Sequence, residues 1–323
     1  IWRRMSSSPS ATPTPHRAAI PFPAIVITLR PERTCAPLKA ALRSLVPRLR
    51  CLRATRKADV AMGPINGTAH LPINTNTRAR LLFHHPPVHP TVFNVGALEV
   101  AILVSHLRAL VRGLESTASD EPFLVFEEDA EWAMLLASPH DAIANLLASL
   151  SNKWSVLQAA VIAEAPYMRH LQRRLSSSAS SGGGRHHRRK RSSATTTSFV
   201  APTAPRATLR GLSWPFTPGR AVIENMTWLK PYWSAAAYAV SPRGATTLLD
   251  TYWPNWRAVQ NTHSKKKSRR ASQPSLEVTI DTTSQLWPAA DQLLFNLSGS
   301  YITTPILTQP VSGSHVEHTK YKR

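Results

Sequence analysis

The sequence predicts an α/β fold in which buried strands alternate with amphipathic helices around a mostly parallel central sheet. Short apolar runs suited to buried strands occur at residues 24–29, 123–126 and 154–162. Between these runs, apolar residues recur at helical spacing. The 323 residues are 42% hydrophobic, which is enough to furnish a core. A three-layer α/β sandwich is the economical arrangement, although the strand order cannot be deduced.

The N-terminal part is expected to form a βα unit. Residues 1–21 are rich in Ser, Pro and Thr without apolar periodicity, which indicates a disordered leader before a domain at 22–323. The strand at 24–29 ends at Pro31. A helix is expected after Pro37, a residue favoured in a first helical turn, and Pro47 could end it. Its apolar positions are Leu38, Leu42, Leu45 and Leu49.

The middle of the chain is expected to alternate between irregular and regular structure. Residues 59–90 are rich in Pro, His and Asn and predict a long loop that could fold over a ligand. Apolar spacing predicts a helix over 97–114. The strand at 123–126 runs directly into three acidic residues, and a second helix is expected from Ser138.

The C-terminal half contains two expected insertions. Residues 175–205 and about 257–279 are rich in Ser and basic residues and predict insertion loops. Between them, residues 232–240 predict a strand, and Ser241 with Pro242 predicts the start of a helix. A last ordered piece is expected from Ala289 to Phe295.

The strong positive charge is concentrated in the two insertions. The chain has 39 Lys and Arg against 18 Asp and Glu, a net charge of +21. Residues 185–191 and 265–270 carry five positive charges each, and therefore ten of the net 21. These clusters lie in Ser-rich stretches without interleaved aromatic residues, which is typical of disordered basic loops. Nucleic acid or another polyanion is therefore an alternative partner and not the expected main one.

Cysteine content and hydropathy limit the classes of protein. No stretch reaches the roughly 18 apolar residues that a membrane-spanning helix needs. Cys35 and Cys51 are the only cysteines, so neither a disulfide scaffold nor a four-cysteine zinc site can form. We expect two separate thiols rather than one bridge, with the bridge as the alternative. Glycosylation sequons begin at Asn66, Asn225 and Asn296, and are usable if the chain is secretory.

The acidic triplet Glu127, Glu128 and Asp129 is the strongest candidate site. Three consecutive carboxylates after a buried strand repel one another and resist desolvation unless a cation offsets them. In open α/β sheets, ligands bind outside the carboxyl ends of strands, where this triplet lies. In extended geometry Glu127 and Asp129 face one side and could share Mg²⁺ or Mn²⁺, whereas Glu128 faces the other. The alternative is a solvated strand-to-loop turn.

Five segments, in order, resemble motifs of the family 25 glycosyltransferases, which include lipooligosaccharide and procollagen galactosyltransferases. The resemblance spans about residues 24 to 318, and Thr28, Leu98 and Glu128 depart from the family pattern. The matching segments are 25–33 (IVITLRPER), 99–109 (EVAILVSHLRA), 124–130 (LVFEEDA), 154–158 (WSVLQ) and 237–245 (AYAVSPRGA).

The resemblance implies a GT-A-like fold and transfer of galactose or glucose from a UDP-sugar to an acceptor hydroxyl, assisted by Mn²⁺ or Mg²⁺. The acceptor would be a glycan, a protein or a lipid, and the compartment the lumen of the ER or Golgi. A catalytically inactive relative is the alternative. The implied site residues are Thr28, Arg30 and Arg33 near the nucleotide; Ser105 and His106 as a donor-site or structural pair; Glu127 and Asp129 on the metal; and Asp291 and Glu128 in catalysis.

Three of these residues also have structural interpretations. Arg33 could be a surface arginine at a helix entry, and an isolated histidine such as His106 on an apolar helix is often a hydrogen-bonded interior residue. Asp291 could be a helix N-cap or an acid in a first helical turn.

Overall fold

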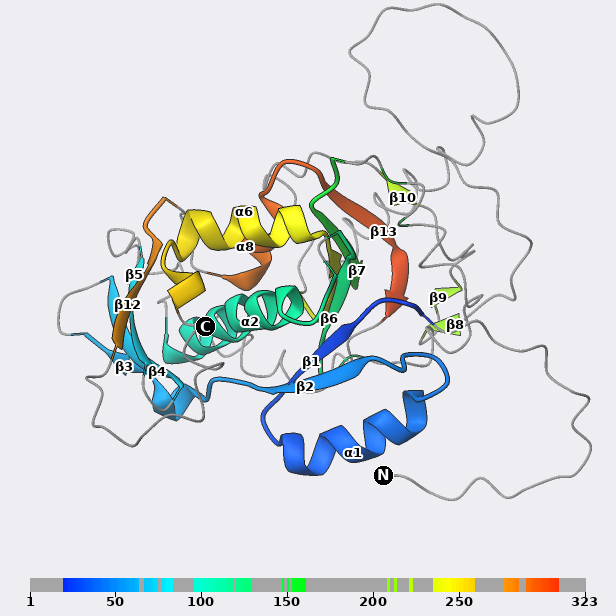
Figure 1. Cartoon of the computed structure of the whole chain (residues 1–323), viewed down its shortest axis with the longest axis horizontal. Coiled ribbons are helices and arrows are strands. Elements are labelled where there is room, and N and C mark those ends of the chain that lie inside the picture. Colours follow the sequence, from blue (N-terminus) through cyan, green and yellow to red (C-terminus); the bar gives the residue numbers. More distant parts are fainter. Residues whose placement is uncertain are drawn as a thin grey trace, which may run out of the picture.

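A computed structural model of the chain shows a seven-stranded and a four-stranded sheet with helices packed between them (Figure 1). All structural statements concern the residues that it describes. These are 20–63, 67–74, 77–83, 96–118, 120–128, 130, 147, 150, 153–160, 208–209, 212–213, 221–222, 235–258, 276–284 and 289–307.

The larger sheet has seven strands in the order β10-β13-β7-β11-β6-β1-β2. β1 pairs in parallel with β2 and β6, and β7 pairs in parallel with β13. β11 is antiparallel to its neighbours β6 and β7, and β10 is antiparallel to β13. Five strands therefore share one direction, which confirms an α/β fold with a mostly parallel sheet. The strands are β1 Ala24–Thr28, β2 Leu49–Arg53, β6 Phe123–Glu127, β7 Val156–Ala160, β10 Ala221–Val222, β11 Ala237–Val240 and β13 Ser300–Leu307.

The smaller sheet has four strands in the order β12-β5-β4-β3, and it corrects two predictions. The loop expected at 59–90 contains three strands, and the end of the second expected insertion belongs to β12. In β5 the side chains alternate between buried and exposed, because Ala79 and Leu81 face the core while Arg78 and Arg80 face solvent. The strands are β3 Ala61–Met62, β4 Thr68–Asn74, β5 Thr77–Phe83 and β12 Leu276–Thr282; two further short strands, β8 Thr208–Leu209 and β9 Leu212–Ser213, pair with each other.

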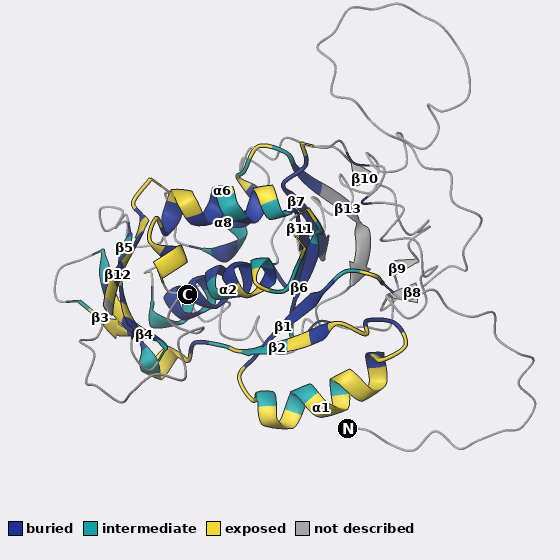
Figure 2. Cartoon of the chain, viewed as in Figure 1, coloured by how far each residue is buried: buried dark blue, intermediate teal, exposed yellow. Residues whose placement is uncertain are grey.

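Helix α2 (Ala97–Leu114) has the bounds expected from the sequence and lies between the two sheets. One hydrophobic cluster joins it to the inner faces of both sheets and to helices α6 (Pro242–Tyr252) and α8 (Ala290–Phe295). In Figure 2, α2 and the strands β6 and β7 are drawn largely as buried, whereas α6 has exposed residues on its outer side. The N-cap of α6 is confirmed, since the Ser241 hydroxyl accepts a hydrogen bond from Gly244 N at 3.0 Å.

Helix α1 (Pro31–Leu42) packs on the other face of the larger sheet through a second hydrophobic cluster. It begins at Pro31, six residues before the predicted start, and Pro37 lies inside it. The predicted start at Pro37 was wrong because a proline also marks a first helical turn at Pro31. Pro31 occupies that first turn, where its missing N–H would have had no helical partner. Leu49, expected in this helix, belongs to β2.

A disulfide bond joins Cys35 on α1 to Cys51 on β2, with the two Cα atoms 5.9 Å apart. The expectation of two separate thiols was therefore wrong. The reason is topological: α1 returns the chain to the edge strand β2, and no sequence pattern reveals that proximity. The fold also begins slightly earlier than expected, because Ile20 is buried and its N–H donates to Leu45 O.

The remaining organisational predictions have mixed outcomes. The strand predicted at 154–162 corresponds to β7, and the one at 232–240 corresponds to the shorter β11. A 3₁₀ turn, η1 (Lys57–Asp59), follows β2. The insertion at 175–205 and most of the helix expected from Ser138 lie outside the described residues. Within the described part, no helix is long and apolar enough to cross a membrane.

Candidate functional site at the ends of β1 and β6

The ends of two neighbouring parallel strands bring together residues about 100 positions apart. Ile27 on β1 pairs with Glu127 on β6, so Thr28 and Glu128 lie side by side just beyond this pair. Backbone bonds fix the strand end, because Glu127 N donates to Ala236 O at 2.8 Å and Glu128 N donates to Ile27 O at 3.0 Å. This is the carboxyl edge of the sheet, where α/β proteins bind ligands.

The two glutamates face opposite sides of the sheet, as the alternation along a strand requires. Val125 belongs to the cluster around α2, and Phe126 belongs to the cluster around α1. Glu127 accordingly contacts α2, and Glu128 contacts α1.

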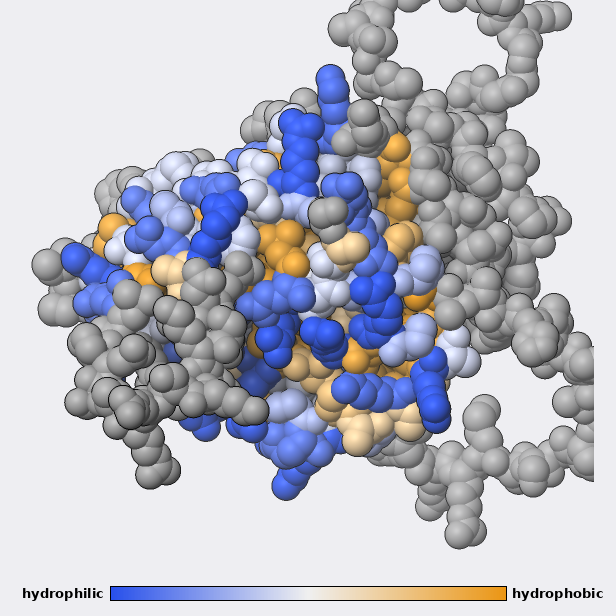
Figure 3. Space-filling view, in the orientation of Figure 1, coloured by the Kyte–Doolittle hydropathy of each residue, from blue (hydrophilic) through white to orange (hydrophobic). Residues whose placement is uncertain are grey.

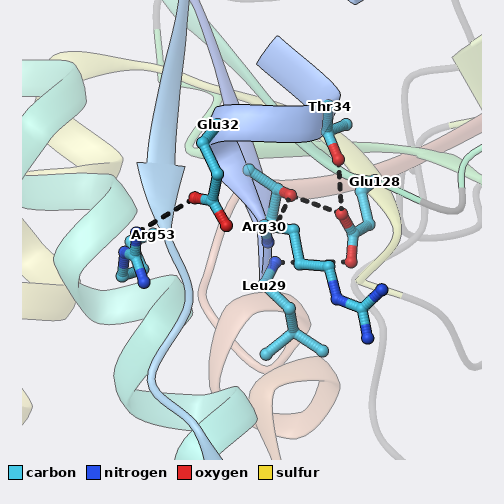
Figure 4. A network of polar contacts seen from close by, with 7 residues as sticks. Leu29, Arg30, Glu32, Thr34, Arg53 and Glu128 are labelled. Atoms are coloured by element: carbon cyan, nitrogen blue, oxygen red, sulfur yellow. Dashed lines mark hydrogen bonds and ion pairs between the residues drawn. The ribbon is translucent and has the colours of Figure 1, made fainter.

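The Glu128 carboxylate binds the turn between β1 and α1 (Figure 4). Its Oε2 accepts hydrogen bonds from the hydroxyls of Thr28 and of Thr34, the latter at 3.2 Å, and its Oε1 accepts one from Leu29 N at 3.3 Å. The Thr28 hydroxyl also accepts a bond from Arg30 N at 3.1 Å. Glu128 and Thr28 therefore fix the backbone that presents the start of α1.

Arg30 and Arg33 lie exposed at the start of α1. Among the described residues, no carboxylate forms an ion pair with either guanidinium, whereas nearby Glu32 pairs with Arg53 at 3.0 Å. Leu29, beside Arg30, is one of two large hydrophobic residues that the described part leaves exposed. Figure 3 shows a face of the molecule on which hydrophilic and hydrophobic residues are mixed. As far as the described residues show, the turn thus offers two guanidinium groups to an anion.

Glu127 is held from the opposite layer by a buried histidine. His106 on α2 is 2% exposed, and its Nε2 lies 3.0 Å from Glu127 Oε1. Its Nδ1 lies 3.1 Å from the hydroxyl of Tyr238, on the antiparallel strand β11 beside β6. The ring of Tyr238 packs edge-on against Phe295 of α8, with ring centroids 6.3 Å apart. The Glu127 side chain remains 25% exposed, so one end of this chain of contacts reaches solvent.

Asp291 lies near the same tyrosine. Burial raises the pKa of Tyr238 well above its ordinary value, and the negative charges of Glu127 and Asp291 raise it further. The tyrosine therefore keeps its proton at neutral pH. Asp291 occupies the first turn of α8 and is partly exposed, which agrees with the structural interpretation of this residue and leaves it accessible.

Ser105 does not join this site. Its hydroxyl donates to Ala101 O at 2.7 Å and accepts from Thr55 N at 2.9 Å, so it ties α2 to the segment after β2. Arg108, one turn further along α2, donates to the Thr55 hydroxyl at 3.1 Å, and burial lowers its pKa. Both residues support the scaffold rather than a ligand.

Tyr238 is the residue of this site that the sequence did not single out. It lies in a short apolar run, where an aromatic side chain predicts only core packing. The available signal was its hydroxyl, because a tyrosine buried in a strand needs a polar partner.

Glu127 has the chemistry of a cation ligand. It is a partly exposed carboxylate at the carboxyl edge, and a buried group holds one of its oxygens, as is usual for metal-ligating side chains. Asp129, its expected partner, lies outside the described residues. The described residues alone contain no group of three His, Cys, Asp or Glu side chains that could hold a metal. Additional ligands would have to come from residues outside the described ranges, Asp129 among them, from a bound substrate or from water.

Comparisons of the chain with protein-family models, with curated proteins and with solved structures gave no significant match. The fold and the site define an α/β protein with two glutamates at the end of β6 and two arginines just beyond the end of the neighbouring parallel strand β1.

Proposed function

We propose that this chain is a metal-assisted glycosyltransferase of the family 25 type, with a GT-A-like three-layer sandwich. It would transfer galactose or glucose from a UDP-sugar to an acceptor hydroxyl. One observation carries the proposal: Glu127, fixed by buried His106, lies at the same sheet edge as Arg30 and Arg33, whose guanidinium groups form no ion pair with the described residues. A carboxylate that can bind a metal and guanidinium groups that can bind phosphate, at the same sheet edge, suit a metal-bound diphosphate.

The donor diphosphate would be bound from both strands. Arg30 and Arg33 can each donate two hydrogen bonds to phosphate oxygens, because the guanidinium fork matches their spacing. Glu127 and Asp129 would hold Mn²⁺ or Mg²⁺. When bound, the cation neutralises charge on the departing nucleotide.

The transfer step needs a group that accepts the acceptor's proton. As the acceptor oxygen bonds to the anomeric carbon, the bond from that carbon to the diphosphate oxygen breaks, and UDP leaves with the electron pair. The hydroxyl proton passes to Asp291, which lies in the first turn of α8 near Tyr238.

Glu128 is assigned a supporting part in this scheme. Its two oxygens bind Thr28, Leu29 and Thr34, so its contribution to catalysis would pass through the turn that carries Arg30. Thr28 would likewise shape the nucleotide site through the backbone rather than by direct contact.

We also propose that the protein matures in the lumen of the secretory pathway. The disulfide between Cys35 and Cys51 supports this compartment, since such bonds persist where the environment is oxidising. The acceptor would then be a glycan, protein or lipid of that pathway.

Release of UDP from UDP-galactose and UDP-glucose, measured with Mn²⁺ and candidate acceptors, tests the reaction. We expect Glu127→Gln and Asp291→Asn to reduce the rate about 100-fold or more, because each removes a charged group from the site. Asp250→Asn is the matched control: Asp250 is an aspartate on α6 that binds Trp256 and Arg257, and its loss should leave the rate unchanged. Wild-type rates in both site variants would contradict the assignment.

A further inference from the structure

A buried chain of polar groups crosses three elements behind Glu127. Tyr238 on β11 is fully buried, His106 on α2 is 2% exposed, and Glu127 on β6 is the member that reaches solvent. The Tyr238 hydroxyl, the imidazole and the carboxylate follow one another at 3.1 Å and 3.0 Å. Such a chain is costly to bury unless each donor has an acceptor, so the direction of its hydrogen bonds is constrained.

The direction of these hydrogen bonds follows from the two groups at the ends of the series, the Tyr238 hydroxyl and the Glu127 carboxylate. Burial and two nearby negative charges keep the proton on Tyr238, so its O–H must donate. Among the described residues, the acceptor placed for that proton is His106 Nδ1. An imidazole that accepts at Nδ1 carries its proton on Nε2, and that N–H then points at Glu127 Oε1, which as a carboxylate oxygen only accepts.

We propose that Tyr238 and His106 are positioning residues that fix the Nε2–H tautomer of His106 and thereby hold Glu127 as a preorganised cation ligand. The tautomer rests on these contacts together with the protonated Tyr238 hydroxyl, whereas the role toward a cation rests on the proposed function. Glu127 Oε1 is occupied by the imidazole, and its Oε2 has no hydrogen bond to the described residues. Within the described part of the chain, Oε2 is therefore the oxygen that is open to a ligand.

This arrangement explains why a hydroxyl occurs at position 238. Tyr238 pairs across the sheet with Val125, two residues before Glu127, so β11 presents the hydroxyl to the α2 layer beside the strand that ends at the site. Phenylalanine would fill the same volume and keep the edge-on contact with Phe295, but it would leave Nδ1 without its donor. The hydroxyl thus serves the imidazole rather than the packing.

The first test determines the tautomer in the metal-free protein. Nitrogen-15 NMR of the histidine side chains should show a protonated Nε2 and a bare Nδ1 for His106 in the wild type, with the signal assigned by its loss in His106→Gln. In Tyr238→Phe the two tautomers should mix. A wild-type Nδ1–H form overturns the proposal whatever the metal does, and this readout requires no variant of Tyr238 to fold.

The second test titrates the protein with Mn²⁺ alone and monitors Mn²⁺ binding by electron paramagnetic resonance. We expect Tyr238→Phe and His106→Gln to weaken Mn²⁺ binding about 10- to 100-fold, as loss of a group behind a metal ligand typically does. Thr282→Val is the matched control, because it removes a buried hydroxyl that donates to Leu82 O in the smaller sheet. It should lower stability and leave Mn²⁺ binding unchanged.

The two tests separate the inference from the proposed function. If the predicted tautomer is present but the wild type binds no Mn²⁺, the metal-assisted function fails while the hydrogen-bond chain stands. If the wild type binds Mn²⁺ and Tyr238→Phe binds it equally well, the positioning role is refuted and the function remains.

Discussion

Glu127 and Glu128 are neighbours in the chain, yet they contact different layers of the molecule. Glu127 faces α2 and its buried histidine, and Glu128 faces the β1–α1 turn. The alternation of side chains along β6 is enough to separate the two glutamates, so that identical side chains make different contacts. The partners could not be predicted, since His106 and Thr34 come from elements whose packing is set by the whole sheet.

The contacts of Glu128 predict a loss of stability on truncation. Glu128→Ala should lower the free energy of unfolding by about 1–3 kcal/mol, because three donors of the β1–α1 turn lose their shared acceptor. Urea denaturation followed by circular dichroism measures it.

Glu32→Ala is the matched control for this variant. Glu32 lies on the same turn, and the side chains of its ion pair with Arg53 are both 59% exposed, so its loss should change stability by less than about 1 kcal/mol. Equal effects of the two substitutions would show that Glu128 does not fix the turn.

Helix α6 packs unusually close to the sheet at Gly244. A Cβ atom at this position would lie 2.4 Å from Ser155 O, and backbone atoms cannot move aside as a flexible side chain can. Gly244→Ala should therefore destabilise the protein by about 1–3 kcal/mol despite the better helix propensity of alanine. Thermal unfolding measures this, and Thr247→Ala, an exposed change on the same helix, should have almost no effect. A stabilised Gly244→Ala protein would place α6 further from β7.

Helix α1 depends on its disulfide more than on burial. Leu42 is its one buried residue, so the bond from Cys35 to Cys51 does much to hold it against β2. The double variant Cys35→Ser with Cys51→Ser should lose about 3 kcal/mol, as expected for a loop of this length. Urea denaturation of the wild type with reductant should match the variant. No difference between oxidised and reduced wild type would contradict the bond.

The end of α6 predicts an acid-dependent contribution to stability. The Trp256 indole N–H donates to Asp250 at 2.7 Å and lowers the pKa of that carboxyl, with help from Arg257. A lowered folded-state pKa stabilises the fold above the ordinary pKa of aspartate and loses this effect as the pH falls through the folded value. The wild type should be more stable than Asp250→Asn from pH 7 to 5, and the difference should shrink below about pH 4. A difference that is the same at pH 3 and pH 7 would exclude this ionic origin.

Elements whose apolar residues recur with a strong local period could be predicted from the sequence. Elements and contacts that depend on distant parts of the chain could not. Helix α2 was predicted with its full bounds, because six apolar residues keep helical spacing over 18 residues. The strands β4 and β5 were missed although β5 alternates cleanly, since prolines and histidines around them suggested a loop. The disulfide and the contact of Tyr238 with His106 join residues 16 and 132 positions apart, and only the assembled sheet brings them together.

At the scale of the whole molecule, the site depends on the order of strands. β6 lies between β1, which ends in the turn that carries Arg30, and β11, which carries Tyr238. β2 and α1 flank β1, and the disulfide fastens them to each other. One strand end thereby meets a basic turn on one side and a buried hydrogen-bond chain on the other.

Calorimetric titration of UDP and UDP-galactose, with and without Mn²⁺, tests the central claim of a metal-assisted nucleotide-sugar site most directly. It compares the wild type with Glu127→Ala and Asp129→Ala, and with Asp250→Asn as the control. The account predicts Mn²⁺-dependent binding in the wild type and the control that is lost in both triplet variants. Absence of binding under every condition, or binding unaffected by loss of Glu127 and Asp129, would contradict it.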